Sequence, residues 1–213
     1  MSSVIVDYNS GNLHSAKKSF QLISDELDQG EVLVSGDPDV ILKAERIILP
    51  GVGTFTDCKV NLVKQTGLIE AIEERVIKDG KPFLGICVGH QLMASMGLEN
   101  NVKTKGLGWV AGTVKKITPS DPKLKVPHMG WNTLIFDRNH HLFNGISSHD
   151  HAYFVHSYHL DLENSYDRSA YTEYGQHVTA AVFKENMAGT QFHPEKSQSV
   201  GLQFIRNFLL WRP

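Results

Sequence analysis

Cys87 has the clearest setting for chemistry in this sequence, because it lies between two glycines at the end of an apolar run. The run Phe83–Ile86 predicts a buried strand, and GICVG (residues 85–89) predicts a sharp turn into a helix over Val88–Met96. This order is typical of a nucleophile elbow, which holds its nucleophile at the carboxyl edge of a parallel sheet. The helix N-terminus would favour a thiolate, and the amide of Val88 would help to bind an oxyanion. The alternative is a small cysteine buried in the core.

A cysteine nucleophile needs a general base, and the base needs a group that orients it. The segment QFHPEKS (residues 191–197) offers both, since Glu195 follows His193 by two positions. Pro194 disfavours a helix, and in an extended segment alternate side chains point to the same side. We therefore predict that the Glu195 carboxylate holds the tautomer of His193 and supports its charged form. The alternative is a strand end on which a surface histidine and a glutamate happen to alternate.

The glycine-rich segment LPGVGTF (residues 49–55) follows another predicted strand. Gly51 and Gly53 would let backbone N–H groups approach a carbonyl oxygen and complete an oxyanion hole with the amide of Val88. A nucleotide loop is the weaker interpretation, because GVGTFT lacks the third glycine of a dinucleotide fingerprint. The sequence also has no G-x-x-x-x-G-K-[ST] motif.

The other reactive side chains have settings that predict no chemistry. Cys58 lies in the polar stretch TDCKVN, and we expect it to be structural or incidental. The stretches NHH (residues 139–141) and SHDH (residues 148–151) lie among turn residues without a convincing set of further metal ligands. We therefore expect solvated loop histidines, no metal site and no cofactor.

The elements that must position these residues alternate between strand and helix in the first half of the chain. Apolar runs predict strands at residues 4–8, 32–34, 46–49 and 83–86. Helices are expected at His14–Leu22 and Leu68–Lys78, the second with an apolar face of Leu68, Ile69, Ile72, Val76 and Ile77. Repeated strand–helix units predict an α/β fold with an open, mostly parallel, twisted sheet and helices on both faces.

The second half has a different pattern, in which short polar breaks separate strand-like segments. These segments are residues 107–117, 132–136, 152–159, 168–174 and 178–183, and they predict antiparallel additions to the sheet. Leu202, Ile205 and Leu209 mark the apolar face of a last helix. No linker or repeat divides the chain, so we expect one domain over residues 1–213.

The overall composition excludes several classes of protein. Of the 213 residues, 41% are hydrophobic and 21% are charged, which is typical of a globular protein. A formal net charge of -2 gives no general attraction to nucleic acid or to an anionic membrane. The start MSSVIVDYNS lacks the basic region of a secretory signal, and no apolar run approaches membrane-spanning length. With 2 cysteines and no secretion signal, we expect free thiols and a cytoplasmic location.

Seven short motifs, in the expected order, give the sequence a family resemblance. PGVG, GICVGHQ and HPEK resemble the class I (triad-type) glutamine amidotransferases. VDYNSGNLHS, KGLGWVAG, VPHMGWN and YFVHSYH resemble, more narrowly, the glutaminase subunits of imidazole glycerol phosphate synthase. The resemblance covers essentially the whole chain.

The resemblance implies a role for each motif. Cys87 would be the nucleophile, His193 the base and acid, and Glu195 its orienting group. The segment Pro50–Gly53, with Gly51, Val52 and Gly53, would be an oxyanion strand that needs a backbone flip before it can donate. The residues that would hold glutamine are Gln91, Glu99, Ser157 and Tyr158. Tyr153 and Lys196 would contact a (β/α)8-barrel synthase in a heterodimer, which uses the ammonia to make imidazole glycerol phosphate and an aminoimidazole carboxamide ribotide in histidine synthesis.

Two features depart from the common family pattern. His90 stands where the family often has Met, and GLENNVKTKG (residues 97–106) has few acidic residues. Similar variants occur in paralogues that supply ammonia to a nucleotide-sugar or surface-polysaccharide pathway, which is the alternative acceptor.

Two other classes of protein also compete with this interpretation. A small cysteine peptidase would share the elbow but would not need PGVG or HPE, and the intact Cys, His and Glu set argues against a silent docking subunit. An unflipped PGVG loop also predicts low glutamine hydrolysis by the chain without its partner.

Overall fold

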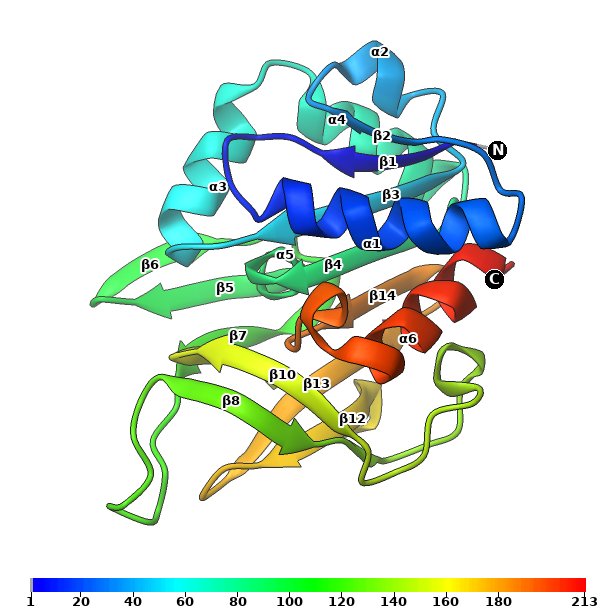
Figure 1. The fold of residues 1–213 in the computed structure, drawn as a ribbon. Helices are drawn as coiled ribbons and strands as arrows, with labels where there is room; N and C mark the ends of the chain where they lie inside the picture. Colours follow the sequence, from blue (N-terminus) through cyan, green and yellow to red (C-terminus); the bar gives the residue numbers. More distant parts are fainter. Residues whose placement is uncertain (1) are drawn as a thin grey trace.

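The central sheet of the computed structural model, which describes residues 2–213, has eight strands. Their spatial order is β2 (Val32–Ser35), β1 (Ser3–Val6), β3 (Arg46–Gly51), β4 (Phe83–Cys87), β14 (Met187–Thr190), β13 (His177–Lys184), β12 (Arg168–Glu173) and β9 (Ile135–Phe136) (Figure 1). The pairs from β2 to β14 are parallel, and the remaining pairs are antiparallel. Every residue of β1, β3 and β4 is buried, as expected for parallel strands covered on both faces. The predicted α/β fold is confirmed.

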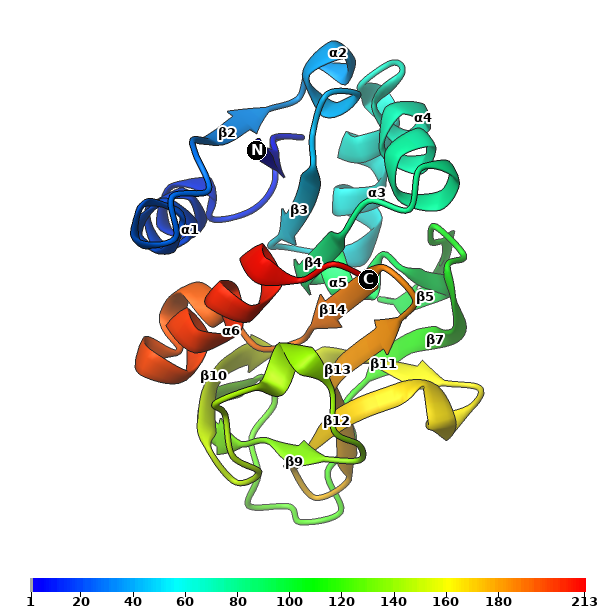
Figure 2. The ribbon, with the colours of Figure 1, turned by 90° about the vertical axis from the view of Figure 1, so that its right-hand side faces the viewer.

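Helices cover both faces of this sheet (Figure 2). On one face, α1 (Leu13–Glu26) packs against α6 (Gln198–Leu210), with the rings of Phe20 and Phe208 edge to face at 6.3 Å. On the other face lie α3 (Phe55–Lys64) and α4 (Leu68–Glu73), while α2 (Pro38–Ile41) is a short helix that follows β2. None of the helices within residues 2–213 combines the length and the apolar composition that a membrane span requires.

The helices predicted in the first half are present, with one local change. Residues 14–22 lie inside α1, and residues 68–78 form α4 followed by a π-helical turn at Glu74–Lys78. A π turn holds more residues than an α turn and therefore rotates the side chains that follow. For this reason Ile77, expected on the buried face, is 52% exposed, whereas Val76 is buried.

Two smaller sheets lie beside the central one. The first has the order β11 (Tyr158–Leu162), β7 (Val110–Lys116), β5 (Ala94–Glu99) and β6 (Val102–Lys105), and the second pairs β8 (His128–Thr133) with β10 (His151–His156). The predicted antiparallel additions are confirmed for β13, β12 and β9, which extend the central sheet, whereas the segments predicted at residues 107–117 and 152–159 belong to the smaller sheets. The single strand expected at residues 152–159 is two strands of different sheets, which meet at Ser157.

The helix expected over Val88–Met96 is also wrong in length. The helix α5 (Val88–Gln91) has 4 residues, and the chain then enters β5. Gly97 of β5 pairs with Thr104 of β6 and with Val114 of β7, so sheet pairing overrides the helical pattern. The electrostatic support from a helix N-terminus is therefore limited to a single turn.

Candidate active site

The sharp turn predicted around Cys87 is present at the end of β4. Cys87 has φ 55 and ψ -111, which lies outside the ordinary regions for a residue with a side chain. The two glycines have no space for a side chain: a Cβ at Gly85 would lie 2.6 Å from the Gly89 carbonyl oxygen, and one at Gly89 would lie 1.8 Å from that of Leu49. Close backbone packing thus holds the thiol at the carboxyl edge of the sheet, where it is 5% exposed.

His193 and Glu195 form a buried pair, in which Nδ1 of the imidazole lies 2.8 Å from Oε1 of the carboxylate. Both side chains are 3% exposed. The sequence suggested that an extended segment brings Glu195 next to His193, but the structure has a turn there instead. Pro194–Lys196 is a 3-10 turn with proline at its first position, where the missing N–H costs nothing. Only His193, just before the turn, is extended.

The position of His193 is fixed by a neighbour along the chain, Ser197, and by Tyr153 of the strand β10. Its N–H donates to the carbonyl of Tyr153 at 2.9 Å. The Ser197 hydroxyl donates to the carbonyl of His193 at 2.7 Å and accepts from the N–H of Tyr153 at 3.0 Å. The base and the strand β10 are therefore joined by one main-chain hydrogen bond and by the bridging hydroxyl of Ser197.

Opposing effects set the charge of His193. Burial alone would lower its pKa, but interaction with Cys87 and then with the Glu195 carboxylate outweighs burial and raises the pKa to about 10. Its Nε2 has no hydrogen-bond partner within the described residues. The imidazole can therefore hold a proton on Nε2 and present it towards the pocket.

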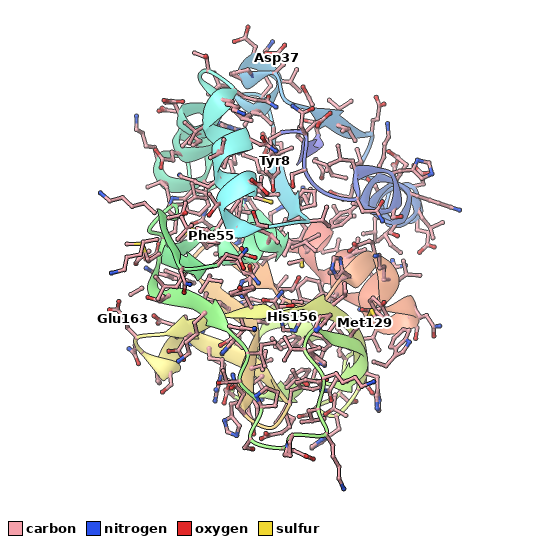
Figure 3. All side chains as sticks on the ribbon, turned by 90° about the vertical axis from the view of Figure 1, so that its left-hand side faces the viewer. Tyr8, Asp37, Phe55, Met129, His156 and Glu163 are labelled. Carbon is pink, nitrogen blue, oxygen red and sulfur yellow. The ribbon has the colours of Figure 1, made fainter. Side chains whose placement is uncertain are left out.

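A pocket of about 390 Å³ opens beside the Cys87 thiol. Predicted site residues in its wall are Val52, Gly53, Cys87, Val88, Gln91, Glu99, Ser157, Tyr158, His193 and Lys196. Three predicted residues lie outside the wall: Gly51 beside the elbow, Glu195 behind His193, and Tyr153 on β10. Pro127, Val155 and His156 also line the pocket, although sequence reasoning assigned them no role. Figure 3 views the carboxyl edge of the sheet, with Tyr8, Phe55 and His156 labelled.

Glu99 lies in this wall at the end of β5. Its carboxylate accepts a hydrogen bond of 2.5 Å from the N–H of Phe55, the first residue of α3. Burial raises the pKa of Glu99, against the stabilising effect of that hydrogen bond. Glu99 therefore supplies an oriented acceptor at the mouth of the pocket.

The loop Pro50–Gly53 is held by polar contacts to Val52. The Val52 carbonyl accepts from the Ser10 hydroxyl at 2.8 Å and from the Cys58 thiol at 3.3 Å. The Val52 N–H also donates to the Ser10 hydroxyl, at 3.4 Å. In this conformation the N–H of Val52 is directed to Ser10, and Cys58 has a definite structural contact.

A chain of neutral histidines supports the opposite wall. His156 Nδ1 lies 2.9 Å from the Tyr158 carbonyl, which can only accept, so this nitrogen carries the hydrogen. His156 Nε2 must then accept from His128 Nδ1 at 3.0 Å, and His128 Nε2 accepts from the Asn132 amide at 3.2 Å. Burial lowers the pKa of His156 to about 3 and that of His128 to about 4, so both rings are neutral near pH 7.

Of the histidines in the two loops, only His140 differs from the solvated setting that the sequence suggested, since His141, His149 and His151 are exposed. His140 packs on Phe183 and Trp211, with ring centroids at 4.5 and 5.7 Å, and burial lowers its pKa to about 4. His141 and Asn139 line a shallow hollow with it. Within residues 2–213, no group of three or more His, Cys, Asp or Glu side chains is arranged to hold a metal ion.

An exposed aromatic patch lies next to the pocket, on the outer face of β8 and β10. Met129 is 66% exposed and Trp131 is 47% exposed. The ring of Trp131 meets that of Tyr153 at 5.9 Å, and Lys196 Nζ lies 5.8 Å from the same tyrosine ring. We call Met129, Trp131, Tyr153 and Lys196 the docking patch. Sequence reasoning named only its last two members, although VPHMGWN contains the other two.

Comparison with known proteins identifies the family of this chain. The family model for glutamine amidotransferase class-I matches residues 17–211. The chain is 54% identical to the imidazole glycerol phosphate synthase subunit HisH of Cereibacter sphaeroides and 53% identical to that of Ruegeria pomeroyi, over 100% of both chains in each case.

Solved structures show the same fold at lower identity. A glutamine amidotransferase from Thermotoga maritima has a TM-score of 0.63 at 16% identity, covering 92% of this chain and 76% of that one. Another glutamine amidotransferase has a TM-score of 0.71 at 16% identity, covering 97% of each chain. The chain therefore belongs to the class-I glutamine amidotransferase family, and within it to the group of imidazole glycerol phosphate synthase HisH subunits.

Proposed function

We propose that this chain, working as one glutaminase domain, hydrolyses glutamine through a thioester on Cys87 and passes the ammonia to a synthase partner in histidine biosynthesis. The observation that carries the proposal is the meeting of Cys87 with the buried His193–Glu195 pair at one pocket. The whole-length relatives are HisH subunits, which favours histidine synthesis over a sugar-modification pathway as the destination of the ammonia.

Acylation uses the two sides of the pocket together. Cys87 and His193 form an ion pair in which the thiol proton already lies on His193 Nε2, and the thiolate sulfur attacks the side-chain carbonyl carbon of glutamine. The amide of Val88 donates to the oxyanion of the tetrahedral intermediate. His193 then gives the proton to the leaving nitrogen, the C–N bond breaks, and ammonia departs, because an amide anion is far too poor a leaving group.

Deacylation repeats the same proton transfers with water. His193 takes a proton from a water molecule as its oxygen attacks the thioester carbon. The C–S bond then breaks, the sulfur recovers the proton from His193, and glutamate leaves. Glu195 holds the imidazole and its charge through both steps without itself reacting.

The wall of the pocket supplies the groups that recognise glutamine. The Glu99 carboxylate is suited to bind the substrate ammonium group, because the hydrogen bond from Phe55 orients it and its oxygens can accept further hydrogen bonds. Gln91, Ser157 and Tyr158 complete the polar surface around the substrate.

The loop Pro50–Gly53 limits the reaction in the isolated chain. The N–H of Val52 donates to Ser10, so it is not directed at an oxyanion on the Cys87 side. Rotation of this peptide would add the second donor, and loss of one such donor typically costs about 3–4 kcal/mol in the barrier. We therefore expect slow glutamine hydrolysis until the partner favours the rotated loop.

The partner is proposed to be a (β/α)8-barrel synthase that binds the docking patch in a cytoplasmic heterodimer. Exposed aromatic and methionine side chains of this kind are typical of protein interfaces. Lys196 belongs both to the patch and to the pocket wall, so a bound partner would cover the pocket mouth. Ammonia would then enter the partner without protonation in bulk water. Nucleic acid and membranes have no place in this scheme.

Labelling with a glutamine-like diazo-ketone tests the proposal. The reagent should modify Cys87 in the presence of the partner, and mass spectrometry of the peptides should find no label on Cys58. The variant Cys87→Ala should keep its fold and its partner but release no glutamate. Near-normal glutamate release by Cys87→Ala would refute the thioester, and a chain that stays unlabelled with its partner bound would support a silent docking subunit.

A further inference from the structure

The side-chain amide of Gln191 reaches the sulfur of Cys87. Its Nε2 lies 3.7 Å from Sγ, which is within hydrogen-bond range for sulfur. Gln191 is fully buried, directly after β14 and two residues before His193. A buried amide costs free energy unless it is hydrogen-bonded, so a residue used only for packing at this position would be better apolar.

The direction of this hydrogen bond follows from the residues behind it. Gln91 lies 2.9 Å from the Tyr158 carbonyl, which can only accept, so Gln91 must present its Nε2 there. The same Nε2 lies 2.9 Å from the Gln191 side chain, so Gln191 must present its oxygen to Gln91. The NH₂ group of Gln191 is then the group that faces the sulfur.

We propose that Gln191 is a further catalytic residue, which donates a hydrogen bond to the Cys87 sulfur and stabilises its thiolate. A thiolate accepts hydrogen bonds more strongly than a thiol, because charge-assisted bonds are the stronger ones. The proton that leaves the sulfur goes to His193, and Gln191 keeps both of its own. This role rests on the proposed function of Cys87 as the nucleophile.

The same chain links the nucleophile to the substrate pocket. Both hydrogens of Gln91 Nε2 are used, by Tyr158 and by Gln191, so its Oε1 is the atom left for a substrate N–H group. Gln91 thus contacts the pocket on one side and fixes Gln191 on the other. Loss of Gln91 should affect binding of glutamine, whereas loss of Gln191 should affect the reactivity of the sulfur.

The test measures alkylation of Cys87 by iodoacetamide as a function of pH, with mass spectrometry of the peptides to separate it from Cys58. Gln191→Met removes the donor at similar size. We expect its alkylation profile to move about 1 pH unit higher and kcat for glutamine to fall about tenfold at similar KM. Gln191→Glu keeps an oxygen that accepts from Gln91 but loses the NH₂ group that donates to the sulfur. It should change the alkylation profile and kcat in the same directions as Gln191→Met. It is the replacement test if the methionine variant does not fold.

Gln91→Met is the matched control, because it breaks the chain one link further from the sulfur. It should raise KM, and it should move the alkylation profile of Cys87 less than Gln191→Met does, because the NH₂ group of Gln191 is still present to donate to the sulfur. Gln191 variants that fold, as judged by circular dichroism, and keep the parent alkylation profile and kcat would overturn the proposal. The alkylation profile of Cys87 tests its contact with Gln191, whereas the activity of Cys87→Ala tests the proposed thioester mechanism. A negative result in the first experiment is therefore distinct from a negative result in the second.

Discussion

The elbow around Cys87 and the loop Pro50–Gly53 border the same pocket but are held in different ways. At the elbow, backbone atoms pack so closely that a Cβ on Gly89 would lie 1.8 Å from a carbonyl oxygen. In the loop, a Cβ on Gly53 would meet no atom within 4 Å, and Val52 is 44% exposed. Pro50 and Gly51 form the end of β3 and pair with β4, and the Tyr8 hydroxyl donates to the Pro50 carbonyl at 2.7 Å. Val52 and Gly53, the adjustable part of the loop, are held mainly by polar contacts between Val52 and the side chains of Ser10 and Cys58.

This difference separates a permanent part of the site from an adjustable one. The elbow cannot change its conformation without unpacking the end of β4, so the nucleophile is in place before any substrate or partner binds. Each polar contact of the loop contributes only about 1 kcal/mol net, so a binding partner can exchange it for others. Four predictions test this division, from the largest expected effect to the smallest.

Gly89→Ala should have the largest effect, because the added methyl group would collide with the Leu49 carbonyl in the closest contact of the elbow. We expect the free energy of unfolding in urea to fall by about 4 kcal/mol, with loss of glutaminase activity. Gly80→Ala is the control: its φ is +65, but a Cβ there meets nothing within 4 Å. It should cost only about 1 kcal/mol and keep activity. Equal losses in the two variants would show that close packing does not hold the elbow.

The variant Glu195→Gln tests whether His193 belongs to the permanent part of the site, because it removes the carboxylate that stabilises the charged imidazole. Its pKa is raised to about 10 in the folded chain, from 6.5. A histidine whose pKa is higher in the folded than in the unfolded chain stabilises the fold. This stabilisation is complete when the pH is below the pKa of the unfolded chain, and it is lost as the pH rises through the pKa of the folded chain. At about pH 6, we expect the free energy of unfolding of the wild type to exceed that of Glu195→Gln by about 2 kcal/mol. This difference should shrink as the pH rises towards 10. A difference that grows with pH would contradict this sign.

Ser10→Ala should release the adjustable part. It removes the hydroxyl that contacts the carbonyl and the N–H of Val52 and the thiol of Cys58, at a half-buried position. We expect glutaminase activity without the partner to rise about tenfold, because about 1.4 kcal/mol would no longer favour the resting loop. Ser120→Ala, which loses a hydroxyl contact far from the pocket, should leave this activity unchanged. Lower basal activity in Ser10→Ala would mean that the hydroxyl favours the active loop.

His90→Met should have the smallest effect, a gain of about 1 kcal/mol in the free energy of unfolding. Both ring nitrogens of His90 are buried without a hydrogen-bond partner among the described residues, and burial lowers its pKa to about 3. An apolar side chain of similar length avoids that desolvation cost. His14→Met, at an exposed position of α1, is the control and should change little. Thermal unfolding measures both, and a lower melting temperature for His90→Met would reveal an unseen partner of the ring.

The parts of the site that depend on local geometry could be predicted from the sequence. The glycines around Cys87 and the proline between His193 and Glu195 restrict the backbone over a few residues, so their spacing identifies the turn and the pair. The buried apolar runs of β1, β3 and β4 similarly predict the parallel sheet. The roles of these residues in catalysis stay predictions until the variants are measured.

The rest depends on neighbours that lie far away in the sequence. Residues 94–96 have a helical pattern, but their pairing with β7 makes them part of a strand. Ser10 and Cys58 are separated by 48 positions, yet the hydroxyl and the thiol lie 3.0 Å apart and both contact the Val52 carbonyl. Gln191 lies in the same short motif as His193, yet its contact with a sulfur 104 positions earlier cannot be seen without the fold.

The hydrogen bond from the His193 N–H to the Tyr153 carbonyl, together with the Ser197 hydroxyl that bridges the two residues, has a consequence for engineering this assembly. The carbonyl and N–H of Tyr153 fix the base, while its ring belongs to the docking patch. A designer who truncates the ring to alter affinity would leave the backbone anchor of the imidazole intact. Truncation of the Tyr153 side chain should therefore change the affinity for the partner without changing glutaminase activity. A proline at this position lacks the N–H and would disturb both.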